Sequence, residues 1–306
     1  MRRTTRSQSR QGSQTTTATA PLPNTPFLLK NAPQPPSVSW TLSTLFTPKL
    51  TGLSRSSTAL LNNKRDKLRA SISRLRRTTE SHLAQALDAT LVFVQEEAGT
   101  AVCISPTGLL LTCSHCVADD AASALDTSIP HWLIFATGVV VRAVCIAWDA
   151  RRDLALLQIT HAEPPTHSTV LEAANLPSSP TFPCATVSPP VQLVLTTPLL
   201  CIGHPGSEDL EASTPGQATG YDVLHVSEGA YCGMAKGQDP QDNSEIGALM
   251  HDCWTYWGHS GAPILEKRTA AVVGLHSSWD EETGMRRGVA VEAVRAFLEE
   301  YTTLKA

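Results

Sequence analysis

The sequence has no apolar run long enough to form a membrane helix. Its 306 residues contain no uninterrupted stretch approaching the roughly 18–20 apolar residues that span a bilayer. The charged N-terminus has no apolar stretch behind it, which excludes a secretory signal peptide. No route to an oxidising compartment is evident, so we expect the eight cysteines to be thiols. The expected location is intracellular, either cytoplasmic or nuclear, with a mitochondrial location as an alternative.

Acidic residues are almost absent from the first part of the chain. Residues 1–80 hold 14 Lys and Arg but only two acids, Asp66 and Glu80, which is a net charge of +12. Residues 81–306 hold 10 basic and 26 acidic residues, a net charge of −16, so the overall −4 is a cancellation. Two electrostatically different parts therefore share one chain.

Large apolar residues are also missing at the start. Residues 1–20 contain no Leu, Ile, Val or aromatic residue, and residues 21–48 add seven prolines. Such a segment cannot offset its conformational entropy by burying surface, so we expect a disordered basic tail over residues 1–60. A solvated tail, a transit peptide, and an arm that binds a polyanion or a protein partner are all open interpretations.

A basic amphipathic helix is predicted over residues 61–88. Its apolar residues fall close to one face and its basic residues surround them, with the apolar set being Leu68, Ile72, Leu75, Leu83 and Leu87. Such a helix can lie on a membrane or a partner, or it can pack on the domain that follows. We favour packing on the following domain.

The remaining chain, residues 89–304, is predicted to be a β-rich domain with a closing helix over 291–302. Short apolar segments, mostly separated by Gly, Pro, Asp or Ser, predict a β-sandwich or a pair of barrels. The candidate strands are 90–95, 100–104, 109–112, 131–136, 139–147, 154–159, 191–195, 199–203, 223–227, 246–250, 262–265 and 271–276. Residues 161–190 are rich in Pro, Ser and Thr, as expected of a linker between two barrels.

Three segments carry residues of the types used in nucleophilic catalysis. They are residues 112–117 (TCSHCV), 153–157 (DLALL) and 258–263 (GHSGAP). A serine hydroxyl needs a base in hydrogen-bond contact, and His115 can accept its proton near pH 7. A buried Asp153 would hold that imidazole in the correct tautomer, and Ser260 would be the nucleophile. His, then Asp, then Ser is one of the known triad orders.

The glycine before the candidate nucleophile has its own purpose. Gly258 lets the backbone turn sharply, so that its N–H and the N–H of Ser260 can point at one spot. Donors at that spot would bind the oxyanion of a tetrahedral intermediate, where each is worth about 10²–10³ in rate.

These segments resemble those of trypsin-like serine proteases, most of all the high-temperature-requirement (HtrA) branch. Further similarities are residues 99–102 (GTAV), 106–112 (PTGLLLT), 201–206 (CIGHPG) and Asp252, eight residues before Ser260. Residues 272–277 (VVGLHS) resemble the strand that pairs with substrate backbone, and residues 288–291 resemble the family's end. The resemblance covers about residues 90–300 and extends to the protease domain only, with no PDZ module expected after the closing helix.

The resemblance implies an all-β fold of two six-stranded antiparallel barrels with flanking helices, over about 90–160 and 190–290. It implies a serine endopeptidase that hydrolyses peptide bonds through an acyl-enzyme, with protein or peptide substrates and no cofactor. The residue roles that it implies are His115, Asp153 and Ser260 as triad, Gly258 and Ser260 as oxyanion hole, and Trp254, Tyr256, Trp257 and Ser277 as substrate-binding residues. The aromatic residues are equally well interpreted as plain core residues.

Some positions depart from the family pattern. His259 lies where activated trypsins have an Asp that pairs with a new N-terminus, and HtrA proteases have Asn there, so activation by N-terminal cleavage is not expected. Tyr256 and Ala98 fall where secreted trypsins have cysteines of disulfides, which agrees with a reducing compartment. The segment before Ser260 has no acid at the pocket floor, so a preference for Arg or Lys substrates is not expected.

Two alternatives concern the function itself. The cysteines of residues 113–116 (CSHC) suggest zinc, but their spacing is too tight for a usual site, and we expect no metal. The second alternative keeps the fold without the activity, as a protease-like scaffold or binding module. His259 beside Ser260 favours it, because a bulky residue there could distort the oxyanion loop.

Overall fold

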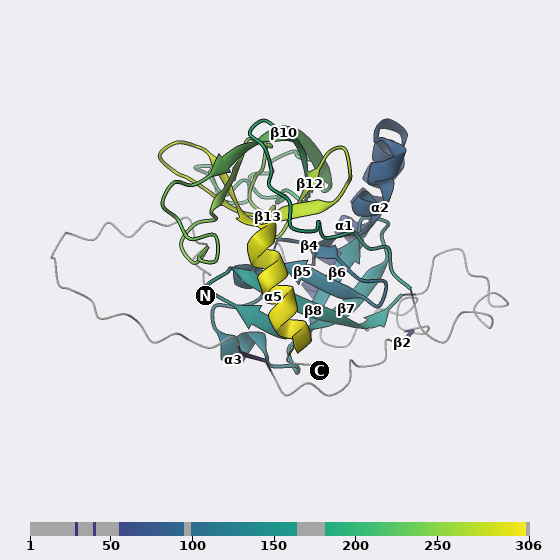
Figure 1. The fold of residues 1–306 in the computed structure, drawn as a ribbon. Helices are drawn as coiled ribbons and strands as arrows, with labels where there is room; N and C mark the ends of the chain where they lie inside the picture. The colour runs from purple at the N-terminus through teal and green to yellow at the C-terminus, as the bar shows by residue number, and fades with distance from the viewer. Residues whose placement is uncertain (1–27, 30–38, 41–54, 95–98, 164–180, 304–306) are drawn as a thin grey trace.

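The computed structural model describes residues 55–94, 99–163 and 181–303, together with the short strands β1 (Leu28–Leu29) and β2 (Ser39–Trp40). Two closed barrels lie one above the other in Figure 1, and helix α5 runs in front from the second barrel down across the first. The fold is therefore all-β with flanking helices, as the family resemblance predicted.

The first barrel is built from six strands in the order β7-β6-β3-β4-β5-β8, closed by pairing of β7 with β8. Neighbouring strands within this barrel are all antiparallel. β1 adds to β7, and β2 adds to β8 as a parallel strand. The six strands are β3 (Thr90–Phe93), β4 (Thr100–Cys103), β5 (Leu109–Thr112), β6 (His131–Phe135), β7 (Val140–Asp149) and β8 (Leu154–Ala162).

The second barrel also has six antiparallel strands, closed in the order β10-β11-β14-β13-β12-β9. The β10–β11, β12–β13 and β13–β14 pairs contain register shifts that bend their strands, as closure of a small barrel requires. Its strands are β9 (Pro198–Gly203), β10 (His225–Met234), β11 (Leu249–His251), β12 (Pro263–Glu266), β13 (Val272–Trp279) and β14 (Arg286–Ala290). The expectation of two six-stranded barrels is thus confirmed.

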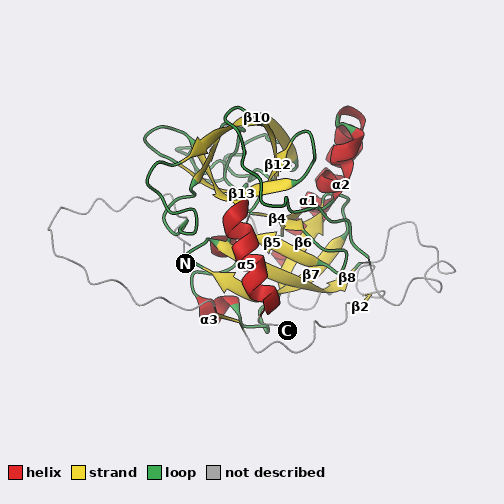
Figure 2. Cartoon of the chain, in the orientation of Figure 1, coloured by secondary structure: helices red, strands yellow, loops and turns green. Residues whose placement is uncertain are grey.

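Helix α5 (Val291–Thr303) joins the end of the second barrel to the wall of the first. Val294, Phe297 and Tyr301 are buried in the same hydrophobic cluster as the first-barrel strands. Arg152, in the turn before β8, is paired with Glu300 near the end of this helix. Because β3, β4 and β6 are buried along their whole length, both faces of these strands are covered, and helices supply part of that cover. Figure 2 shows α5 crossing strands of the first barrel.

The basic helix packs against the domain. Its strand-facing residues Leu61, Leu68 and Ile72 are buried in the main core. Its cations pair with acids of the domain, as in Arg65–Glu163 (3.4 Å) and Arg74–Asp222 (2.5 Å), and with an acid of the helical segment itself, as in Arg76–Asp88 (2.6 Å). The helical segment is divided into α1 (Arg55–Thr78), the short 3₁₀ turn η1 (Ser81–Leu83) and α2 (Ala84–Asp88). Part of the positive charge near the N-terminus is therefore neutralised within the chain.

Some predicted boundaries differ from the structure. α1 begins at Arg55 inside the expected tail, because Leu61 belongs to the buried stripe and needs a preceding helical turn. The predicted strand at 191–195 is wrong, since Val194 and Leu195 are exposed and Thr196 has a φ of +68° in a turn. β14 (Arg286–Ala290) was not among the predicted strands. Most of the expected tail, and residues 164–180 of the expected linker, lie outside the described residues.

In the described part of the chain, no helix has the length and apolarity that crossing a membrane would require.

Candidate active site

His115 lies directly after strand β5, in the single 3₁₀ turn η2 (Ser114–Cys116). The turn is held from outside, because the indole Nε1 of Trp148 donates a hydrogen bond to the carbonyl of Ser114 at 3.0 Å. The imidazole is partly buried, with 27% of its side-chain surface exposed. The strand end and the indole therefore fix where the imidazole can lie while one of its edges stays accessible.

Asp153 meets His115 from the turn between β7 and β8. Its φ is +55°, a left-handed conformation that Asp adopts more readily than most residues. The carboxylate is completely buried, and its Oδ1 lies 2.9 Å from His115 Nδ1. Ser114 Oγ donates to Oδ1 at 2.9 Å, and Ser277 Oγ donates to Oδ2 at 2.7 Å. A buried carboxylate needs such partners, and this one is densely hydrogen-bonded.

The protonation of His115 follows from this pairing. Burial by itself lowers the pKa of an imidazole, but the charge and hydrogen bond of Asp153, aided by Cys116, raise the pKa of His115 above its ordinary value. With Asp153 accepting from Nδ1–H, the neutral imidazole presents a bare Nε2. Such an imidazole is arranged to accept a proton at Nε2, and the nearby carboxylate stabilises the resulting cation.

Ser260 lies in the turn before β12 and approaches the His115–Asp153 pair from the second barrel. Its hydroxyl donates a hydrogen bond to the backbone carbonyl of Ser277 at 3.2 Å. Ser277 therefore connects the two halves, because its own hydroxyl donates to Asp153 while its carbonyl accepts from Ser260. Within the described residues, no hydrogen bond joins Ser260 to His115. The structure thus brings all three residues to the barrel interface, with the serine hydroxyl turned to the backbone.

The loop before Ser260 is held by contacts from both barrels. Gly206 N–H donates to the carbonyl of Trp257 at 2.7 Å, and the hydroxyl of Thr100 donates to the carbonyl of Gly258 at 2.8 Å. Because a trans peptide points its C=O and N–H in opposite directions, the Gly258 N–H faces away from Gly206. Among the described residues, the N–H groups of Gly258 and Ser260 have no hydrogen-bond acceptor. They are therefore available to a ligand.

Only glycine fits at position 258. Its φ is +93°, and a Cβ there would lie 2.4 Å from the carbonyl oxygen of His204. The loop that contains Gly258 can approach the carbonyl of His204 this closely because glycine has no side chain.

His259, which departs from the family pattern, is completely buried and packs on Gly203, where a Cβ would lie 2.3 Å from its ring. Its Nδ1 accepts the N–H of Tyr256 at 3.1 Å, so the ring closes the turn. Burial, with the nearby charge of His225, lowers the pKa of His259 to about 3. A neutral imidazole here stabilises the loop without an ion pair.

The predicted aromatic residues lie beside this loop and are half-buried. Trp254 contacts the rings of Tyr221 and His225, with ring centroids 5.0 and 4.6 Å apart. Tyr256 donates its hydroxyl proton to Asp209 at 2.7 Å. Trp257 packs edge-on against Trp279, with ring centroids 4.8 Å apart. None of the three is fully buried, so each keeps surface that a ligand could contact.

Sequence reasoning missed three contributors to this site. They are Ser114, which binds the carboxylate of Asp153, Thr100, which holds the carbonyl of Gly258, and His204, which abuts Gly258. Ser114 is next to His115 in the sequence, and this position is a signal that could have identified it as a residue of the site. Thr100 and His204 are distant in sequence, and no local pattern indicates their contacts.

A metal ion has one candidate ligand set among the described residues. Donor atoms of Cys113, His115 and Asp153 all lie within 4.8 Å of one another. This set shares two residues with the His–Asp pair, so metal binding would compete with the hydrogen bonds that His115, Ser114 and Ser277 make to Asp153.

Two closed antiparallel barrels define the class of double-barrel peptidases when one supplies a His paired with a buried Asp and the other a glycine-flanked serine. Residues 99–275, more than half of the chain, match the family model described as trypsin-like peptidase domain. The chain therefore belongs to the trypsin-like peptidase family and has the fold of a protease. By family it is a hydrolase.

No curated protein matches the sequence. Among solved structures, a serine endoprotease from Yersinia pestis is similar, with 16% sequence identity and a TM-score of 0.48. That similarity covers 72% of this chain and 64% of the other, so the chain spans less than two thirds of the endoprotease's length.

Proposed function

We propose that this protein is a serine endopeptidase that hydrolyses peptide bonds through an acyl-enzyme, with His115, Asp153 and Ser260 as its catalytic residues. The observation that carries the proposal is the completely buried Asp153, held 2.9 Å from His115 Nδ1 and joined to Ser260 through Ser277. Burying a carboxylate is costly, and its use here is to orient one imidazole at the edge of the barrel interface.

In the first step Ser260 Oγ attacks the carbonyl carbon of the scissile peptide bond, and its proton passes to Nε2 of His115. A rotation about the Cα–Cβ bond of Ser260 turns its hydroxyl from the Ser277 carbonyl toward the imidazole. Nucleophile and base are commonly farther apart in a free enzyme than in its substrate complex.

His115 then returns the proton to the departing amine as the C–N bond breaks, which leaves an ester on Ser260. Water attacks this ester and gives a proton to His115, and collapse of the second intermediate releases the acid and restores the serine. Asp153 stabilises the imidazolium in both steps without itself being protonated.

The N–H groups of Gly258 and Ser260 would bind the oxyanion of each tetrahedral intermediate. Their lack of acceptors supports this role, because donors already engaged elsewhere would have to break bonds first. Half-buried Trp254, Tyr256 and Trp257 would contact substrate side chains, and Ser277 would line the substrate edge next to Asp153.

A fluorophosphonate probe tests the proposal, because it labels only an activated serine. We expect the full-length protein to be labelled, the Ser260→Ala variant to lose the label, and the Ser128→Ala control to keep it. Ser128 is an exposed loop residue bound to Asp126. A well-folded wild-type protein that takes no label over the pH range 6–10 would contradict the assignment.

A protease-like scaffold without activity is the second candidate. The hydrogen bond from Ser260 to the Ser277 carbonyl favours it, because a hydroxyl held there is not activated by His115. This candidate predicts no labelling, an intact fold, and a bound protein partner that the Ser260→Ala variant retains. The endopeptidase predicts labelling and, in the Ser260→Ala variant, a substrate that is bound but not cleaved.

The N-terminal tail and the compartment complete the proposal. All eight cysteines carry free thiols in the structure, which supports a reducing intracellular compartment. We propose that the residues before α1 form a basic arm for a polyanion or a protein partner. If so, retention of the full chain on heparin should weaken as salt is raised, and deletion of residues 1–54 should abolish it. Removal of this segment from the mature cellular protein would instead indicate a transit peptide.

A further inference from the structure

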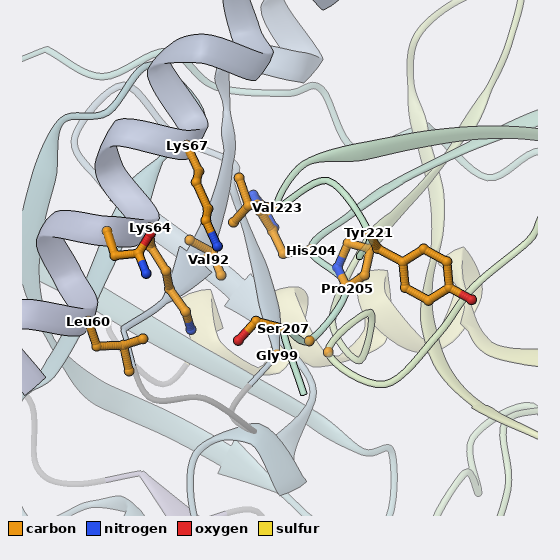
Figure 3. Close-up of a pocket in the computed structure, with 13 residues that line it drawn as sticks. Leu60, Lys64, Lys67, Val92, Gly99, His204, Pro205, Ser207, Tyr221 and Val223 are labelled. Atoms are coloured by element: carbon orange, nitrogen blue, oxygen red, sulfur yellow. The ribbon is translucent and has the colours of Figure 1, made fainter. Parts of the chain in front are cut away.

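A pocket opens between helix α1 and the loop that follows β9, next to the oxyanion loop. Figure 3 shows its wall on one side formed by α1, with Lys64 and Lys67, and on the other by His204, Pro205 and Ser207. Helix α1 precedes the trypsin-like domain, so this wall comes from a segment outside residues 99–275. The proposed catalytic steps do not use any residue of α1.

The pocket borders the reaction centre on the side away from β13. Gly258, whose N–H is a proposed oxyanion donor, lines it, whereas no residue of β13 does. If the acyl half of a substrate runs along β13, its leaving half passes Gly258 toward this pocket. Gly99 lines the pocket as well, and it packs on the backbone of Ser260, because a Cβ there would lie 2.6 Å from the carbonyl oxygen of that residue.

The described residues that line the pocket include two lysines and no acid. Lys67 is exposed on α1, and its side chain in Figure 3 runs toward the loop that carries His204. Arg65 and Arg74 of the helix pair with acids of the domain, whereas Lys67 has no carboxylate partner among the described residues. Lys64 adds a second positive charge, with its ammonium hydrogen-bonded to the carbonyls of Phe93 and Val94 at 3.1 Å.

His204 contributes a hydrogen-bond acceptor to the pocket wall. The one proton of the Thr100 hydroxyl goes to the Gly258 carbonyl at 2.8 Å, so the 3.2 Å contact between Thr100 Oγ1 and His204 Nδ1 requires Nδ1 to donate. Nε2 is then a bare acceptor, and it is buried with no hydrogen-bond partner among the described residues. Burial lowers the pKa of His204 well below its ordinary value, which keeps the ring neutral.

A polypeptide segment with an N–H donor and a carboxylate matches these features. We infer that the pocket is the subsite for the residues that follow the scissile bond, and that Lys67 makes it select an acidic residue there. This inference rests on the proposed endopeptidase function and adds a specificity determinant supplied by the N-terminal helix. The substrate class is then proteins with Asp or Glu just after the cleavage point.

The experiment uses the full-length protein and internally quenched peptides. A peptide library of known sequences first locates the preferred cleavage point. Matched peptides are then made that differ only in one of the two residues after it, carrying Asp or Lys. We expect kcat/KM to be about three- to tenfold higher for the Asp peptide, and the preference to shrink at high salt, because the ion pair is exposed.

Substitutions at Lys67 should alter this ratio. Lys67→Gln should bring the ratio close to one, and Lys67→Glu should invert it. The control Arg77→Glu makes the same charge change on an exposed residue of α1 outside the pocket, and it should leave the ratio as in the wild type. A ratio of two substrates within one variant cancels any loss of folded protein, so a merely structural role of Lys67 would not move it.

The outcomes separate the two proposals. The fluorophosphonate carries no residue that would enter this pocket, so both Lys67 variants should still be labelled. Labelling of the wild type together with equal cleavage of the Asp and Lys peptides would overturn the subsite alone, as would a ratio that Lys67→Glu leaves unchanged. No labelling at all would overturn the endopeptidase, and the subsite with it.

Discussion

The two barrels contribute differently to the site. The first barrel supplies a pair that is already fully engaged, because Asp153 holds His115 and accepts from Ser114 as well. The second barrel supplies Ser260, whose hydroxyl is bound to backbone, and two N–H groups that have no acceptor among the described residues. In the proposed mechanism the base is therefore organised before substrate arrives, whereas the nucleophile and the oxyanion donors acquire their partners only in a complex.

Removing the charge of Asp153 should have the largest effect. Asp153→Asn should lower turnover by about 10⁴-fold, because an amide no longer holds His115 in the required tautomer. The loss of the carboxylate should also shift the acid limb of the pH–rate profile downward. In the wild type, the raised pKa of His115 puts that limb above pH 6.5, since only the neutral imidazole accepts a proton.

The matched control is Asp149→Asn, four residues earlier. Asp149 pairs with Arg152 at 2.9 Å instead of with His115. It should leave the pH–rate profile in place and turnover close to the wild-type value. Equal losses in the two variants, measured by labelling rate and peptide hydrolysis, would contradict the role of Asp153.

Gly258→Ala should have the next largest effect. It alters the part of the site that the second barrel supplies and leaves the His115–Asp153 pair in place. The new Cβ would lie 2.4 Å from the His204 carbonyl, so the loop must shift and one oxyanion donor is lost. We expect kcat to fall by about 10²–10³-fold. Gly237→Ala is the control, since its φ of +80° is similarly strained but nothing lies within 4 Å of the added Cβ. If the control lost as much kcat, strain and not the oxyanion loop would be the cause.

Ser277 connects the halves, and its removal tests whether the connection matters. Ser277→Ala removes the hydroxyl that donates to Asp153 at 2.7 Å but keeps the carbonyl that accepts from Ser260. A loss on the order of tenfold in kcat is expected, because Asp153 keeps its bonds from His115 and Ser114. The neighbouring Ser278→Ala should change kcat little. Unaltered kcat in Ser277→Ala would mean that the first-barrel pair needs no support from the second barrel.

The last prediction concerns stability in acid and does not concern activity. The buried imidazoles of His251, His259 and His276 belong to the second barrel, and burial lowers the pKa of each, to about 3 for His251 and His259. The unfolded chain therefore takes up their protons first as the pH falls below 6.5. The free energy of unfolding should decrease by about 1.4 kcal/mol per pH unit for each such proton, until the folded pKa is reached.

Hydrogen exchange resolved by segment checks this prediction. Between pH 7 and 4.5, amides of β11 and β13 should lose protection before those of β4 and β5. His259→Asn should reduce the pH dependence of the urea midpoint by about one proton. Uniform loss of protection across both barrels would show that the histidines do not make the second barrel the acid-sensitive half.

Local patterns in the sequence predicted much of this fold. The segments around His115, Asp153 and Ser260 each combine a strand end with a turn, and most of the alternating apolar segments are strands in the structure. Residues 191–195 show the limit, because an apolar run became an exposed turn where no neighbouring strand covered it. The two open interpretations of the basic helix were resolved by contacts with Glu163 and Asp222, which no local pattern contains.

The sequence alone determined the residue types, their order, and the division of the chain into a basic and an acidic part. These are properties of neighbouring residues and of charge, and they need no partner at a distance. Only the tertiary structure decided that Ser277 joins the two halves, that Ser260 donates to a backbone carbonyl, and that α1 lines one pocket with Gly258. The reason is physical: each depends on atoms brought within hydrogen-bond reach by closure and packing of two barrels, across separations of up to about 200 residues.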